Sequence, residues 1–340
     1  MDTIKVRKRL SNIQQESRRR AKQDRCCICG KTVTSFCNSH SIPRFVLERI
    51  ARDGQVLNGA CALDLPFVHQ QDGVNRSGTF YLLCNDCDNM FFSDYENENA
   101  LLDDPTTRSL AQIDLKNVLL QLSKRYYEVE LYDVLQERTS NLHNKIYLDT
   151  IHSLDIRDYL FDFRRAMKII TKNLKSGYDI VYSELLPYVV PIATQSGITM
   201  TKDMENNTIN DIYNDSPDIR IQTMHCCVFP LKDKTRILLF HHKDDRNYKS
   251  FDRQFAKLSK LEKLQYINYL IFKYTENYFV APELTSCFST EMKLKQLCRE
   301  NGDLPDLGFV PMMDDIIPYQ PVAPDEIPNF LSEDHKLHGI

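Results

Sequence analysis

The sequence predicts an α+β protein in which a small cysteine-rich module precedes a larger mixed α/β domain. Three observations predict this class. Two Cys-x-x-Cys pairs lie within the first hundred residues. Two later segments, 106–136 and 153–175, repeat apolar residues at helical spacing. Between residues 221 and 242, two apolar runs flank a short turn-forming segment, which is typical of an antiparallel hairpin.

The first predicted element is a cationic helix over residues 3–24. Its apolar residues form a thin stripe made up of Ile4, Val6, Leu10 and Ile13. Residues 1–31 hold ten Lys or Arg and three Asp or Glu, whereas the whole chain has a net charge of −4. Such a basic segment suits a phosphate backbone, which makes Arg18, Arg19 and Arg20 candidate nucleic-acid contacts. A solvated helix face, or docking onto an acidic protein partner, explains the same charge and stays open.

Two cysteine pairs follow, and their spacing predicts a metal centre. Cys26 and Cys29 form the first Cys-x-x-Cys pair, and Cys84 and Cys87 form the second. One tight turn lets both sulfurs of a pair bind the same ion, and two such pairs supply the four thiolates of a structural, tetrahedral zinc site. Four buried and inert thiols are the alternative interpretation.

The composition favours a metal site over a disulfide framework. The chain has 340 residues and 11 Cys, an odd number in a chain too long to need disulfide staples. Residues 1–25 are too polar for a secretory signal, and no apolar run reaches membrane-spanning length. We therefore expect a soluble cytoplasmic protein with no membrane partner. Two cysteines close to the pairs, Cys27 and Cys37, are alternative ligands for the same ion.

The metal module is expected over residues 25–104. Between the cysteine pairs, residues 51–80 contain four Gly and lack a clear period, so they predict a long connection. A strand over residues 79–83 then delivers the second pair, and Asp103-Asp104-Pro105 ends the module. The predicted division of the chain is therefore a basic helix (1–24), this module (25–104), a mixed α/β domain for regulation or recognition (105–301) and a proline-rich tail (302–340).

The mixed domain begins with the two amphipathic helices over 106–136 and 153–175. Residues 202–218 are rich in Asn and Asp and predict a loop. The other expected elements are strands at 180–182, 187–192 and 198–200, a hairpin of 221–229 with 236–242, and one long helix over 251–279. Residues 302–340 are rich in Pro and lack periodicity, which predicts a segment that wraps the surface or is partly disordered.

Between the cysteine pairs lies His40-Ser41-Ile42-Pro43, and this His-x-x-Pro adds a resemblance to the metal prediction. The order of cysteine pair, His-x-x-Pro, leucine-rich strand, cysteine pair and helix resembles the zinc-bearing branch of the HNH nucleases. The resemblance covers about residues 25–97 and rests on Cys26, Cys29, His40, Pro43, Leu83, Cys84 and Cys87. It implies a treble-clef or ββα zinc module. The same stretch is also similar to a group of HNH-like bacterial proteins of poorly defined role.

The resemblance implies roles for particular residues. His40 lies where the family places its general base, which takes a proton from the attacking water. A divalent ion, Mg²⁺ or Mn²⁺, is expected to stabilise charge on the phosphate. Where the family has Asp or His before this histidine, the chain has Ser39, so further ligands are expected on the helix after the second pair. The candidates there are Asp88, Asn89, Asp94 and Glu96, and Arg44 is a candidate phosphate contact.

Two functions follow from these residues. The first is a metal-dependent endonuclease that cleaves DNA or RNA phosphodiesters, with the larger domain recognising a target or partner, or restraining the nuclease. Because a toxic nuclease needs such control, a role in defence against phage or foreign DNA follows by analogy alone. The alternative is a non-catalytic zinc module that binds nucleic acid or a protein partner, in which His40 has a structural role.

Overall fold

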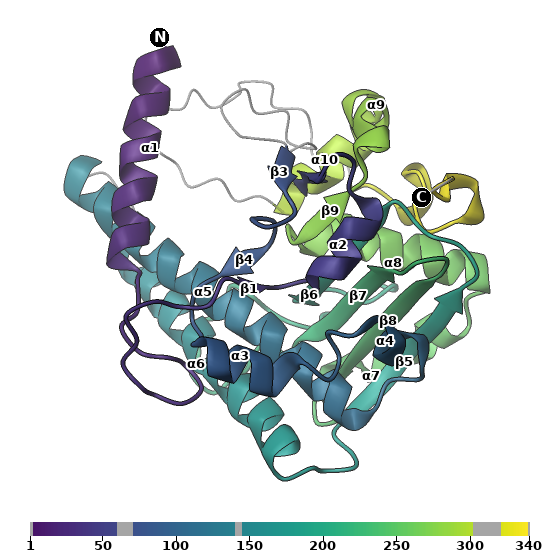
Figure 1. Ribbon diagram of the computed structural model, residues 1–340, viewed down its shortest axis with the longest axis horizontal. Coiled ribbons are helices and arrows are strands. Elements are labelled where there is room, and N and C mark those ends of the chain that lie inside the picture. Colours follow the sequence, from purple (N-terminus) through teal and green to yellow (C-terminus); the bar gives the residue numbers. More distant parts are fainter. Residues whose placement is uncertain (1–2, 60–70, 140–144, 302–320, 339–340) are drawn as a thin grey trace.

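The computed structural model describes residues 3–59, 71–139, 145–301 and 321–338. Within these residues, the largest element is a seven-stranded antiparallel sheet with the strand order β3-β2-β9-β6-β7-β8-β5 (Figure 1). The strands, in chain order, are β2 (Gln55–Asn58), β3 (Gln71–Gly73), β5 (Tyr178–Leu186), β6 (Ile192–Ile198), β7 (Met224–Pro230), β8 (Thr235–His242) and β9 (Tyr278–Val280). Mixed helix and sheet with an antiparallel hairpin confirm the predicted fold class.

Helices cover both faces of this sheet. Those of the larger domain are α5 (Thr107–Thr139), α6 (Lys145–Thr171), α7 (Lys249–Ala256), α8 (Lys260–Tyr274), α9 (Thr285–Thr290) and α10 (Met292–Asn301). In β7, Cys227 lies in the core shared with α5 and α6, whereas its neighbour Cys226 lies in the core shared with α7 and α8. Because successive side chains of a strand point to opposite faces, both faces are buried, and every residue of β7 and β8 is buried.

The cysteine-rich module packs onto the first of these cores. It contains a two-stranded antiparallel ribbon, β1 (Ser39–His40) with β4 (Thr79–Phe80), and the helices α2 (Arg44–Ile50), α3 (Asn85–Phe92) and α4 (Glu98–Leu102). The segment between the cysteine pairs also supplies β2 and β3 to the large sheet, where Leu57 of β2 pairs with Val280 of β9. The module therefore shares both its sheet and its core with the larger domain.

The N-terminal helix α1 (Thr3–Arg20) packs against the distal part of α5 (Figure 1). Ile13 is buried there against Val134 and Leu135, so the thin apolar stripe of this helix has a partner. Arg20 fixes the contact, because its guanidinium donates to Glu137 at 2.7 Å.

The expected single helix over 251–279 is wrong, because the structure breaks it into α7 and α8 and ends it before β9. The break has a local cause. Ser259 accepts a hydrogen bond from the Glu262 backbone N–H, and the Glu262 carboxylate accepts from the Ser259 N–H, which forms a complete capping box. A Ser-x-x-Glu inside a long apolar pattern was the readable signal for a new helix start.

The expected strand over 187–192 is displaced. Strand β5 ends at Leu186 and β6 begins at Ile192, so Pro187 and Pro191 lie in the connection. Proline has no N–H to donate to a sheet, which explains the interruption. The hairpin, the two long helices and the loop over 202–218 are confirmed, with ends that shift by several residues at most.

Residues 321–338 of the predicted tail pack against α8, and residues 302–320 lie outside the described part. Phe330 is fully buried and stacks on Phe288 at 5.7 Å between ring centroids. Asn268 of α8 donates to the Pro328 carbonyl at 2.9 Å. In the described ranges, no helix combines the length and the apolar character needed to cross a bilayer.

A buried ionisable cluster joins α5 to the sheet. Asp114 of α5 accepts a hydrogen bond from the Tyr178 hydroxyl at 2.7 Å, and His225 of β7 lies 3.4 Å from its other oxygen. Burial raises the pKa of Asp114 from 3.8 to about 7 and lowers that of His225 to about 3. The network therefore holds a protonated carboxyl beside a neutral imidazole over much of the acid range.

Asp114→Asn should flatten the pH dependence of stability. Between pH 3.8 and about 7, folded Asp114 keeps a proton that the unfolded chain releases, so its contribution to the unfolding free energy is lost as pH rises through this window. Asparagine cannot titrate. Urea denaturation at pH 5, 6 and 7 measures the effect, with exposed Asp218→Asn as the control. An unchanged slope in Asp114→Asn would contradict the raised pKa.

Candidate metal centre and the site beside it

The four cysteines predicted as zinc ligands lie together. Their sulfur atoms are all within 4.8 Å of one another, and among the described residues they form the one group of three or more His, Cys, Asp or Glu placed to hold a metal. The sulfurs of Cys29 and Cys84 are 3.9 Å apart. That is far longer than a disulfide bond of about 2.05 Å, so the pairs are not cross-linked.

Local sequence explains how each pair presents its sulfurs. In the first pair, Gly30 has a φ of +69°, and its N–H donates to the Cys26 carbonyl at 2.9 Å, which closes a tight turn. In the second, Cys84 is the N-cap residue of α3 and Cys87 lies in its first turn. The Cys84 N–H points at the Cys26 sulfur at 3.4 Å, so the two pairs are joined directly.

The cluster fits zinc. A tetrahedral ion with Zn–S bonds of about 2.3 Å separates its sulfurs by about 3.8 Å, close to the observed 3.9 Å between Cys29 and Cys84. Burial opposes ionisation of Cys26, but backbone N–H groups, led by that of Cys29, lower its pKa to about 7. This favours the thiolate that binds metal. Cys27 and Cys37, the alternative ligands, are not part of the group.

His40 lies on the β1–β4 ribbon, opposite Thr79. Its ring is half-buried, and its Nε2 is 3.2 Å from the Val74 carbonyl oxygen. A carbonyl only accepts, so in the neutral ring Nε2 carries the proton and Nδ1 keeps its lone pair. Burial lowers the pKa of His40, and the charges of Lys116 and Arg44 act in the same direction.

A buried lysine occupies the centre of the neighbouring site. The Nζ of Lys116, from α5, lies 3.1 Å from Asp88 and 2.8 Å from Glu96, and its side chain has no solvent exposure. Ser39 donates to the same Asp88 oxygen at 2.8 Å. We call Lys116, Asp88, Glu96 and Ser39 the lysine network.

The lysine network is tightly constrained. The ammonium of Lys116 lies 3.9 Å from the centre of the Phe92 ring, an additional cation–π contact. Burial raises the pKa of Glu96, and Lys116 opposes this shift. A buried ammonium is stable only when opposite charges satisfy it, and here two carboxylates do so.

This arrangement does not fit a preformed divalent-ion site. Both carboxylates that the sequence suggested as ligands, Asp88 and Glu96, are already paired with the Lys116 ammonium. In the described structure, no hydrogen bond or ion pair joins His40 to either of them.

The other two candidate ligands of a divalent ion, Asn89 and Asp94, lie apart from the lysine network. Asp94 accepts from Arg108 at 2.8 Å and from Gln112 at 2.9 Å, and the Arg108 hydrogen bond is the main cause that lowers its pKa. Asn89 is exposed on α3, and its side chain has no polar partner within the described ranges. The structure thus brings Asp88 and Glu96 together, and leaves Asn89 and Asp94 apart from them.

The four candidate phosphate contacts have different surroundings. Arg20 is committed to Glu137 and Glu16. Arg18 lies over the Tyr127 ring, 5.9 Å from its centre, while Arg19 is exposed. Arg44 forms an exposed pair with Glu48 at 2.9 Å, a kind of contact that contributes little. Arg18, Arg19 and Arg44 therefore remain accessible to an anion.

Lys116 is the functional residue that sequence reasoning missed. It lies three positions after Ile113, on the apolar stripe predicted for that helix, and residues 110–120 are all buried. A lysine on an apolar stripe was the available signal, because such a side chain needs a buried acidic partner.

Comparison of the chain with family models, with curated proteins and with solved structures found no match in any of the three.

Metal analysis should find one zinc ion per chain. Cys84→Ser should lose the ion and unfold the module, because structural zinc binding contributes folding free energy directly. Cys37→Ser is the matched control, since Cys37 lies outside the sulfur cluster and contacts Asp88 instead. Much less than one zinc in the unchelated protein, or equal zinc loss in both variants, would contradict the assignment.

Lys116→Met should lower the unfolding free energy by about 3–5 kcal/mol, because it leaves Asp88 and Glu96 without their counter-charge. Lys124→Met on the same helix is the control. Its exposed pair with Glu276, at 3.4 Å, predicts a loss below about 1 kcal/mol. Chemical denaturation measures both. Similar losses in the two variants would show that the lysine network does not stabilise this region.

Proposed function

We propose that the chain is an HNH-like nuclease that hydrolyses nucleic-acid phosphodiesters, with His40 as its general base. One observation carries the proposal. His40 has its Nε2 fixed on the Val74 carbonyl, so the lone pair of Nδ1 is left for a proton, and burial lowers the pKa of the ring. A general base needs an unprotonated nitrogen held in place, and both conditions are met here.

A cleft next to Val74 offers room for a phosphate, and His40 contacts its wall through the Val74 carbonyl without lining the cleft itself. Its volume is about 440 Å³, and its lining includes Val74, whose carbonyl holds the His40 ring, and Arg44. The charge of Arg44 is among the causes that lower the pKa of His40. Its pair with Glu48 is exposed and weak, and a substrate phosphate can replace it.

The lysine network has a positioning role in this proposal. Ser39 precedes His40 in β1 and donates to Asp88, which Lys116 holds in turn. The zinc cluster connects the same two segments at Cys26 and Cys84. Positioning of this kind lowers the entropic barrier to reaction.

In the proposed step, Nδ1 of His40 removes a proton from a water molecule, and the oxygen attacks phosphorus. One P–O ester bond breaks, the departing oxygen takes a proton from solvent, and His40 then returns its proton to solvent, which leaves a phosphomonoester and a hydroxyl end. Arg44 stabilises the charge that develops on the phosphate. A defence role stays a prediction by analogy.

The second candidate is a zinc-stapled module that binds nucleic acid without cleaving it. The observation that favours it is the pairing of Asp88 and Glu96 with Lys116, since these are the carboxylates that the resemblance would assign to a catalytic ion. In that case the Val74 contact of His40 only orders the ribbon.

His40→Ala should lower cleavage by roughly 10²-fold or more, the usual scale for losing a general base, while zinc content and folding stay intact. Supercoiled plasmid and single-stranded DNA and RNA serve as substrates, each with Mg²⁺, with Mn²⁺ and with a chelator. His338→Ala is the control, because His338 is exposed near the C-terminus. Absence of cleavage in all arms would favour the second candidate, whereas equal cleavage by both variants would show that His40 is not the general base.

A further inference from the structure

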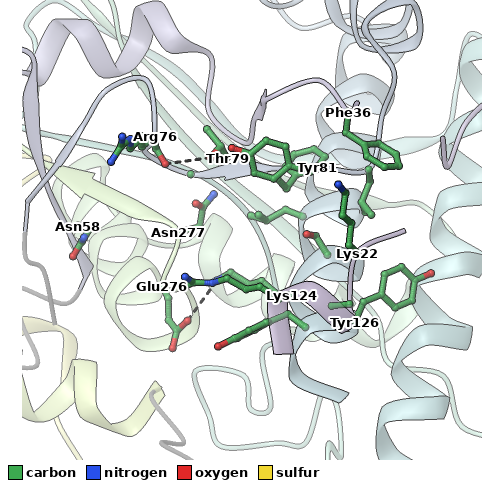
Figure 2. A pocket seen from close by; sticks show the side chains of 18 of the residues that line it. Lys22, Phe36, Asn58, Arg76, Thr79, Tyr81, Lys124, Tyr126, Glu276 and Asn277 are labelled. Atoms are coloured by element: carbon green, nitrogen blue, oxygen red, sulfur yellow. Dashed lines mark hydrogen bonds and ion pairs between the residues drawn. The ribbon is translucent and has the colours of Figure 1, made fainter. Parts of the chain in front are cut away.

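A large cavity lies beside strand β4 of the ribbon, and it shares no lining residue with the cleft next to Val74. The volume of this cavity is about 990 Å³, at the upper end of the range for small-ligand sites. Its walls come from the end of α1, the segment before β1, the ribbon strand β4, helix α5 and the start of β9 (Figure 2).

Aromatic side chains from separate elements line the cavity. Figure 2 shows Tyr81 and Phe36 on one side and Tyr126 on another. Tyr81 is 56% exposed, although it follows the buried Phe80 of β4. An exposed tyrosine at a cavity wall offers a free ring face for stacking. The full aromatic set is Phe36, Phe80, Tyr81, Tyr126, Tyr127, Phe272 and Tyr278.

The charge of the lining is opposite in sign to that of the chain. Four cations, Arg18, Lys22, Arg76 and Lys124, and one carboxylate, Glu276, line the cavity, whereas the net charge of the chain is −4. Lys124 is partly neutralised by Glu276. Within the described ranges, the other three cations have no ion pair, so they are available to an anion.

Stacking faces combined with unpaired cations match one class of ligand. Single-stranded nucleic acid presents unstacked bases to aromatic rings and phosphates to Lys and Arg. In a duplex the bases are stacked and their faces are covered, so it cannot fill such a cavity without opening. The cavity thus favours a single strand over a duplex.

The register of the ribbon connects this cavity to His40. Thr79 lies directly opposite His40 in the pairing of β4 with β1, and residues that oppose each other share a face of the ribbon. Thr79 also lines the cavity, two positions before Tyr81. His40 is not itself a lining residue, so this pairing places the cavity beside the strand that carries His40.

We infer that this cavity binds unstacked bases of single-stranded DNA or RNA and that it selects a single strand as the substrate of the proposed nuclease. The claim that the bound strand is a substrate rests on the proposed function. The claim that it binds does not, because binding is measurable without cleavage. Tyr81 and Phe36 stack on the bases, and Arg18, Lys22 and Arg76 neutralise phosphates.

The test measures binding of fluorescently labelled 12-mers by anisotropy, using oligo-dT, oligo-U and a mixed-sequence duplex with the full-length His40→Ala chain. Tyr81→Ala, added to it, should weaken single-strand binding about 10-fold or more, the scale of losing one stacked base. Tyr213→Ala is the matched control, since Tyr213 is 74% exposed and outside the cavity. Weaker binding of oligo-dT than of oligo-U would identify RNA as the preferred strand.

Salt dependence tests the cations separately. Arg76→Ala should reduce the slope of log affinity against log salt by about 0.7, the single-strand value for one phosphate contact. Arg253→Ala, at an exposed position of α7, should leave the slope unchanged. Duplex binding as tight as single-strand binding, or no effect of Tyr81→Ala, would overturn the inference.

The two proposals fail in different ways. If the chain with native His40 cleaves nucleic acid but Tyr81→Ala cleaves and binds like the parent, the cavity assignment is wrong and the nuclease stands. If single strands bind through Tyr81 and no substrate is cleaved, the cavity assignment stands and the nuclease is wrong.

Discussion

The close approach of four cysteine sulfurs is the constraint on which this region depends. It ties the loop at Cys26 to the start of α3 at Cys84, which are 58 residues apart. The ribbon beside them has two residues in each strand, and a pair this short is not stable on its own. A metal ion held by the four sulfurs would supply the missing free energy, since a zinc site that forms only in the folded state stabilises folding directly. Once the ribbon and α3 are joined, Ser39 reaches Asp88 and the lysine network forms.

Helix α5 then connects this module to the rest of the molecule. Along one helix, Lys116 reaches the carboxylates beside the zinc cluster, Asp114 reaches Tyr178 of the large sheet, and Tyr126 reaches the cavity. Burying polar groups on a central helix is costly unless each finds a partner. These contacts therefore fix the rotation of α5 and its position along its axis, relative to the cysteine-rich module and to the large sheet. Folding of the cysteine-rich module and folding of the larger domain are therefore coupled through the side chains of α5.

The sequence was sufficient for features with local signals. Cys26, Cys29, Cys84 and Cys87 were identifiable from spacing alone, and the long helices from their apolar period. Ser259 and Glu262 carried a local signal that the apolar pattern masked. In contrast, Lys116 pairs with a residue 28 positions away, and β9 pairs with β2, which lies more than two hundred residues earlier in the chain. No periodicity encodes such partners, because they follow from tertiary packing. His40 was identifiable as a candidate, but its Val74 contact and its tautomer were not.

The basic N-terminal segment illustrates why charge counted along a chain does not by itself assign a role. Sequence reasoning set phosphate binding against docking as alternatives for Arg18, Arg19 and Arg20. In the structure the three side chains differ, since Arg20 binds Glu137 of α5 and Arg18 lies over Tyr127 at the cavity. The end of α1 packs on α5 through Ile13 and Arg20, and Arg18 and Lys22 lie in the same part of the chain, at the cavity wall. The position of α1 against α5 therefore accounts both for the contact of Arg20 with Glu137 and for the place of Arg18 at the cavity. One role does not exclude the other.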